Sequence, residues 1–273
     1  MTYPETALTK IKDGSDPINY PDTNWWNAVA KDWATNTEHS LAISGGNEKI
    51  SFYSSAQYMY QDVIYKNSPQ NYNQYQFSTN LDAKITKAIK FGFDILGRQT
   101  VDNRGVRTTE DLFSYFLTTS PMSAPYYPNG LLRTGYDGIT NNAVLMVSDL
   151  PGTSKTTNNT LNLKPKIRID LDVITPGLYA EGYAALDYTF NNGKTTNTPY
   201  DIYSYDSVSG EYTNQRDATG SVSVSSWSSN SSSITLNVRI GYSHLFNNAH
   251  QINAFVAYEQ NKYHYNYLYG YRT

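Results

Sequence analysis

Charged side chains recur at every second position of several segments, and they are the first candidates for chemistry. They are Asp82, Lys84, Lys90, Asp94, Lys166, Arg168, Asp170, Glu181, Asp187 and Arg239. Paired carboxylates could act as general acid and base, and a glycosidase needs two of them roughly 5–10 Å apart, one with a raised pKa. Carboxylates interleaved with Lys and Arg have lowered pKa values instead. We therefore expect these residues to line a hydrated surface and to form ion pairs, rather than to form a binding track or an acid–base pair.

The sequence shows no signal for metal, nucleophilic or cofactor chemistry. The four histidines, His39, His244, His250 and His264, show no metal-ligand spacing, and with no Cys there is neither a thiolate ligand nor a disulfide. The sequence contains no nucleophile-elbow, phosphate-binding or dinucleotide motif. We predict no catalytic residue, no metal and no cofactor, so the protein is not expected to be an enzyme.

Aromatic side chains of two long connections are the candidates for ligand binding, because flat rings stack on the apolar faces of sugars and peptides. The candidates are Phe113, Tyr115, Phe116, Tyr126, Tyr127 and Tyr136 in residues 101–155, and Trp227 in residues 191–230. The same rings could instead form an aromatic girdle or a docking surface for a lid protein. The sequence leaves the two interpretations open.

The elements that position these residues show strict alternation of apolar and polar residues. In residues 74–85, Phe77 and Leu81 lie on one face, and Gln76 and Asp82 lie on the other. Such alternation predicts β-strands. With a first strand near 39–44, about eight are expected, the others in residues 49–64, 74–85, 89–98, 161–171, 178–190, 234–246 and 250–258.

Two further local expectations follow from single residues and short runs. Pro165 cannot donate to a ladder, so we expect a bulge or a sheet edge there. Residues 1–37 are rich in turn formers, with one short helix expected over residues 25–33.

The connections alternate between short and long. Those at 45–48, 86–88, 173–176 and 247–249 are short, whereas those at 65–70, 101–155 and 191–230 are longer. This order predicts an antiparallel up-and-down meander with tight turns at one end and long loops at the other. In outer-membrane barrels the short turns face the periplasm and the long loops face outside.

Strand length and composition favour the same fold. Most of the predicted strands are longer than the roughly 5–6 residues usual in globular proteins. They are long enough to cross a bilayer at a tilt, which takes roughly 9–11 residues. The 26 tyrosines among 273 residues suit a lipid–water boundary. We predict an all-β, transmembrane antiparallel up-and-down β-barrel, of which about eight strands are present, in contact with outer-membrane lipids.

Charge and terminal residues narrow the class further. The net charge of −3 argues against a nucleic-acid partner. No apolar stretch approaches the ~18 residues that a membrane helix needs. The first residues have neither a basic start nor an apolar core, so no signal peptide is expected. This predicts either a cytoplasmic protein or a fragment of a longer protein, and the barrel pattern favours the fragment.

Several motifs resemble the SusC/RagA group of TonB-dependent outer-membrane transporters. The most specific is Ser44-Gly-Gly-Asn-Glu-Lys49 after a strand that begins near His39. Weaker motifs are Tyr20-Pro-Asp-Thr-Asn-Trp25, Tyr72-Asn-Gln-Tyr75, Tyr127-Pro-Asn-Gly130, Thr175-Pro-Gly-Leu178 and residues 250–259. The resemblance extends over nearly the whole chain.

The resemblance implies an N-terminal plug followed by a barrel of roughly 22 strands. Residues 1–37 would be the end of the plug, and residues 38–273 the N-terminal part of the barrel. The charged residues would then hydrate the barrel interior and form ion pairs with the plug. It further implies TonB-powered uptake of oligosaccharides or peptides through the outer membrane of a gram-negative bacterium, with a SusD-like lipoprotein over the long loops. The region that would contact the TonB complex is expected to be missing from this chain.

Two other classes remain open at this stage. A complete eight-stranded outer-membrane barrel, acting as a pore or adhesin, would need a closing final strand. A secreted glycan-binding β-protein would bury its apolar faces under a second sheet.

Overall fold

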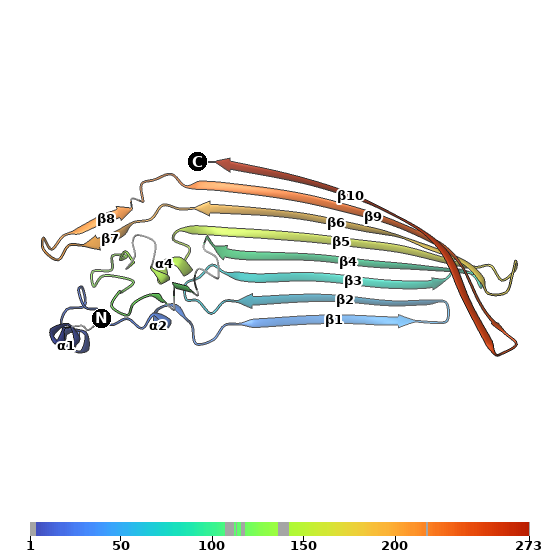
Figure 1. The fold of residues 1–273 in the computed structure, drawn as a ribbon, viewed down its shortest axis with the longest axis horizontal. Helices are drawn as coiled ribbons and strands as arrows, with labels where there is room; N and C mark the ends of the chain where they lie inside the picture. Colours follow the sequence, from blue (N-terminus) through green and yellow to red (C-terminus); the bar gives the residue numbers. More distant parts are fainter. Residues whose placement is uncertain are drawn as a thin grey trace.

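The structure is a computed structural model that describes residues 4–106, 112, 114–115, 118–135, 142–216 and 218–272. An antiparallel eight-stranded sheet dominates it, and its strands lie side by side in chain order (Figure 1). They are β1 (Asn36–Gly46), β2 (Ile50–Asp62), β3 (Asn71–Lys84), β4 (Ile89–Gly105), β5 (Gly152–Asp170), β6 (Leu178–Asn197), β9 (Ser223–Phe246) and β10 (His250–Arg272). The predicted up-and-down order is confirmed. Over the described residues the sheet is open, with β1 and β10 as its edges.

The alternation of short and long connections is confirmed. Tight turns join β1 to β2, β3 to β4, β5 to β6 and β9 to β10 at one end, on the right in Figure 1. Asn247 and Asn248 in the last of these turns have φ of 51° and 54°, the positive values that both central residues of a type I′ turn require. The longer connections lie at the opposite end, and one of them contains a separate hairpin of β7 (Ile202–Tyr205) and β8 (Tyr212–Arg216).

The two faces of the sheet differ in chemistry, because residues paired across antiparallel strands point to the same side. We call the side that carries Asp82, Lys166 and Glu181 the polar face. The opposite side, the apolar face, carries among others Phe77, Ile167 and Ile240, which are 49%, 46% and 57% exposed. No second sheet covers these residues in the part of the chain that the structure describes.

The buried core lies outside the sheet, among the long connections. Helices α2 (Trp25–Val29) and α4 (Ala143–Val147) pack there with Tyr65. A second small cluster joins Leu145 of α4 to Leu132, Tyr200 and Ile202. The long connections therefore form one folded unit beside the ends of the strands, on the left in Figure 1.

The segment before β1 belongs to this unit. The Trp25 indole Nε1 donates a hydrogen bond to the Ser120 carbonyl oxygen at 2.9 Å, and the Arg133 Nη1 donates to the Ile18 carbonyl oxygen at 2.9 Å. An additional helix, α1 (Glu5–Asp13), precedes α2. No helix of the described residues is long and apolar enough to cross a membrane.

Three local expectations are wrong in detail. The turn-rich start contains α1, which ends at Gly14 with φ of 65°. The helix expected over residues 25–33 ends at Val29, because Ala30 forms a bridge with Tyr65 instead. Pro165 causes neither a bulge nor an edge: only the ladder to β6 lacks pairs at residues 164–165, and the register is the same on both sides of that gap.

Candidate functional site

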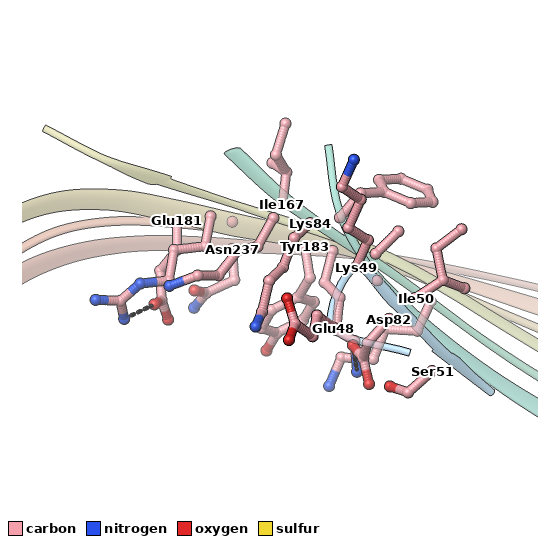
Figure 2. A pocket seen from close by; sticks show the side chains of 18 of the residues that line it. Glu48, Lys49, Ile50, Ser51, Asp82, Lys84, Ile167, Glu181, Tyr183 and Asn237 are labelled. Carbon is pink, nitrogen blue, oxygen red and sulfur yellow. Dashed lines mark hydrogen bonds and ion pairs between the residues drawn. The ribbon is translucent and has the colours of Figure 1, made fainter. Parts of the chain in front are cut away.

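The predicted charged residues gather on the polar face, next to the tight turns. An open hollow of about 740 Å³ lies there, bounded by β2, β3, β4, β5, β6 and β9. Seven of the predicted residues line it: Asp82, Lys84, Lys90, Lys166, Arg168, Glu181 and Arg239. In Figure 2 the side chains of Asp82, Glu181 and Tyr183 extend to one side of the sheet, whereas that of Ile167 extends to the other. Because charged residues two apart in each strand share a face, the register aligns them into rows across the sheet.

Lys166 connects two carboxylates across three strands. Its Nζ lies 3.2 Å from the Asp94 Oδ1 and 3.5 Å from the Asp82 Oδ1. Gly92 makes this position available, since a Cβ there would lie 2.1 Å from the Lys166 Cε. Asp94 also accepts a hydrogen bond from the Asn80 Nδ2 at 2.9 Å.

A second chain of ion pairs runs from β4 to β9. The Lys90 Nζ lies 2.8 Å from the Asp170 Oδ2, and the Arg168 Nε lies 2.9 Å from the Asp170 Oδ1. The Arg168 Nη1 also lies 3.1 Å from the Glu181 Oε2, and Glu181 pairs with Arg239. Asp170 and Glu181 thus each contact two cations.

The cluster extends to β10 through side chains that the sequence analysis did not select. The Lys164 Nζ lies 4.3 Å from the centre of the Tyr183 ring, and the Tyr183 hydroxyl donates to the Glu259 Oε2 at 3.3 Å. The Arg168 Cζ lies 3.9 Å from the centre of the Tyr179 ring. A signal existed, because Tyr179, Tyr183 and Glu259 occupy the same alternate positions as the charged residues.

Among the described residues, two predicted members take no part in these ion pairs. Lys84 lines the hollow beside the turn that joins β3 to β4. Asp187 lies farther along β6 and accepts a hydrogen bond from the Asn162 Nδ2, away from the ion-paired rows. Within the described ranges no three His, Cys, Asp or Glu side chains are close enough together to hold a metal ion.

The predicted loop aromatics divide into different environments. Tyr127 is buried at 5% exposure among the rings of Tyr205 and Tyr212, at centroid distances of 6.3 and 5.0 Å. The Arg133 guanidinium lies 5.1 Å from the Tyr127 ring centre. Burial raises the pKa of the Tyr127 hydroxyl, and the Arg133 charge partly offsets the rise. This ring therefore joins the β7–β8 hairpin to the loop before α4.

The other aromatic candidates are scattered. Tyr126 is 43% exposed, and Tyr115 packs against the core around α2 and α4. Trp227 was expected in a loop, but it lies in β9, where its ring stacks on that of Tyr267 with the ring centroids 6.2 Å apart. Phe113, Phe116 and Tyr136 lie outside the described residues. The structure does not bring Tyr115, Tyr126, Tyr127 and Trp227 together into one pocket.

An up-and-down sheet with long loops at one end, one charged face and one exposed apolar face is typical of part of an outer-membrane β-barrel. Solved structures with this fold include the RagAB peptide transporter. The chain matches one of its chains at TM-score 0.71 and 17% identity, covering 98% of this chain and 30% of the other. The match to the RagAB peptide importer in its closed-closed state has TM-score 0.70 and 18% identity, with 93% and 27% covered.

A relative is also detectable in sequence. Over 81 residues the chain is 31% identical to TonB-dependent receptor P26 of Formosa agariphila, which covers 30% of this chain and 8% of the receptor. No family model matches the sequence. The resemblance to SusC/RagA TonB-dependent transporters is confirmed, at the level of fold across most of the chain. The chain spans less than a third of the length of each of these relatives.

Proposed function

We propose that this chain is part of the barrel of a TonB-dependent, SusC-like importer in the outer membrane of a gram-negative bacterium. The observation that carries the proposal is the exposed apolar face beside a charged face in one continuous meander. An apolar face of this kind is stable against lipid, and a charged face is stable around a water-filled interior. The function is uptake and not catalysis.

The charged cluster fits the lining of the interior near the periplasmic turns. Its side chains are partly exposed and paired, so they can exchange partners with a plug or with water at small cost. We assign the cluster to plug contact and hydration of the interior. A passing substrate would meet both signs of charge there.

The position of residues 4–35 favours a different assignment from the end of a plug. β1 starts at the end of the sheet that carries the long loops, and the segment before it packs against those loops. Long loops face outside in such barrels. We therefore assign residues 4–35 to the outer surface, together with the rest of the core around α2 and α4.

The substrate class and partners come from the relatives. RagAB is described as a peptide importer, and we propose an oligosaccharide or a peptide as the substrate. A SusD-like lipoprotein would cover the folded unit of long connections. The TonB complex would act through a plug, to which we assign no residue of this chain.

Loss of uptake is the direct test. A strain lacking the gene that contains this sequence, and a strain lacking TonB, are grown with a mixture of oligosaccharides and peptides, and depletion of each compound is measured by mass spectrometry. Both strains should fail to take up the same class of compound. Complementation with the complete gene is the control.

The alternatives give other outcomes. A self-contained pore would keep its uptake without TonB, and a secreted glycan-binding protein would be recovered from the medium and not from the outer membrane. Either result would contradict the importer. The open sheet and its uncovered apolar face already favour the importer over both.

A further inference from the structure

Two lysines stand opposite each other on the apolar face, near the long-loop end of the sheet. Lys155 of β5 and Lys194 of β6 are direct cross-strand partners. Both are exposed and line a hollow of about 610 Å³. Like charges directly opposite each other destabilise an antiparallel pair. An anion bound between the two ammonium groups would remove this repulsion.

No carboxylate supplies that negative charge from the neighbouring strands. In the same row, Lys155 is paired with Asn103 of β4, and Lys194 with Ser226 of β9. The adjoining row on this face contains Thr157, Asn192 and Ser228. Among the described residues, neither lysine forms an ion pair within 4.0 Å. The lining thus offers two ammonium groups and neutral polar groups, a set suited to phosphate oxygens.

The position of the lysines relative to the apolar band identifies the source of the phosphate. On β6 the apolar face runs from Leu178 to Phe190, and Lys194 follows four residues later, which is about 13 Å along the strand. The band itself covers about 40 Å of strand, or about 30 Å of depth at the usual tilt, which matches a hydrocarbon core. Lysines just beyond the band lie at the level of lipid headgroups.

We propose that Lys155 and Lys194 bind the phosphate group of an anionic lipid in the outer leaflet. This inference rests on the proposed function, because it requires the apolar face to meet lipid. Leu268, which is 71% exposed and is paired with Ser228, lies beside the hollow and can contact the acyl chains. The two ammonium groups then share one phosphate, which removes their mutual repulsion.

The test measures lipid retained by the complete transporter. The protein is purified in detergent, incubated with monophosphoryl lipid A or with the same lipid after removal of its phosphate, and examined by native mass spectrometry. The Lys155→Gln/Lys194→Gln variant should bind the phosphorylated lipid at least tenfold more weakly than the parent. Lys262→Gln is the matched control, since Lys262 lies on the same face of β10, outside this hollow. It should bind like the parent.

Each outcome decides one point. Equal binding of the phosphorylated lipid by parent and double variant overturns the site, and so does equal binding of both lipids by the parent. Competition by inorganic phosphate at concentrations near that of the lipid would show a site for free phosphate and would contradict a lipid source. A transporter that is absent from the outer membrane would instead refute the proposed function, and fractionation of the cells detects this separately.

Discussion

Glu181 is the residue on which the ion pairs of the polar face converge. It contacts Arg168 of β5 and Arg239 of β9, so one carboxylate joins the two strands that flank β6. The Arg239 Nε is buried and has no hydrogen-bond partner in the described structure, so this guanidinium depends on Glu181 for its compensation. The side chain of Glu181 is 23% exposed, which places the pair between exposed and buried cases.

The Glu181→Gln variant should therefore destabilise the folded protein by about 1–2 kcal/mol, between the values for exposed and for buried ion pairs. Chemical unfolding of the complete protein in detergent measures the free energy of unfolding. Asp187→Asn is the matched control, because Asp187 lies on the same strand and face but accepts only a hydrogen bond from Asn162. It should change the free energy by less than about 0.5 kcal/mol. Equal effects of the two variants would show that the ion pairs contribute nothing particular.

Among the elements, the middle part of each strand could be predicted from sequence, whereas the strand ends near the long loops could not. Phe77, Leu81 and Ile95 alternate with polar residues because one face of the central strands is apolar. Near the long loops both faces are polar, as at Lys155 and Lys194, so period-two alternation disappears. For this reason β9 begins at Ser223, earlier than the pattern indicated, and Trp227 was expected in a loop.

The folded unit of long connections was also hidden from sequence reasoning. Its core combines short segments that are far apart in the chain, such as α2, Tyr65 and α4. Each of the two helices has only five residues, too few for a helical period to be recognised. The charged cluster could be predicted because it follows the strand period. The pairing of Tyr127 with the β7–β8 hairpin could not, because it depends on loop geometry.

Asn142 holds this unit together. Its Oδ1 accepts hydrogen bonds from the backbone N–H groups of Val144 and Leu145, and its Nδ2 donates to the carbonyl oxygens of Pro125 and Arg133 at 2.7 and 2.9 Å. Asn142→Ala leaves these buried groups unsatisfied. It should lower the local stability by about 2–4 kcal/mol, as several lost buried hydrogen bonds would.

Hydrogen exchange of the complete protein, followed by mass spectrometry, should show that Asn142→Ala loses protection in residues 123–135 and in α4 but not in β3 or β4. Asn24→Ala is the matched control, since Asn24 also caps a five-residue helix but accepts only from the Asn27 N–H. Its effect should be limited to about 1 kcal/mol at α2. Unchanged protection in residues 123–135 after Asn142→Ala would contradict the role of this side chain.

At the scale of the molecule, the sheet has one charged side and one apolar side, which the proposed function assigns to water and to lipid. The tight turns and the charged cluster lie toward one end, and the folded loops lie toward the other (Figure 1). The edges β1 and β10 expose backbone donors and acceptors, and each such group left unsatisfied in lipid costs several kcal/mol. The sheet is therefore stable in a bilayer only where further strands continue it on both sides.

The assignment of the faces can be tested at two adjacent serines in the middle of β2. Ser54 is paired with Thr79 and lies on the apolar face, whereas Ser55 is paired with Ser78 and lies on the polar face. This chain has no Cys, so Ser54→Cys and Ser55→Cys can each carry the one nitroxide label of this part of the protein, once any Cys elsewhere in the complete protein has been replaced. In a lipid bilayer the label at position 54 should collide more with oxygen, which concentrates in lipid, than with a water-soluble nickel complex. The label at position 55 should show the reverse ratio, or low collision with both where a plug covers it.

The two positions share residue type, strand and depth, so each is the control for the other. Equal oxygen accessibility at positions 54 and 55 would mean that the apolar face does not meet lipid, and the barrel wall would have to be abandoned.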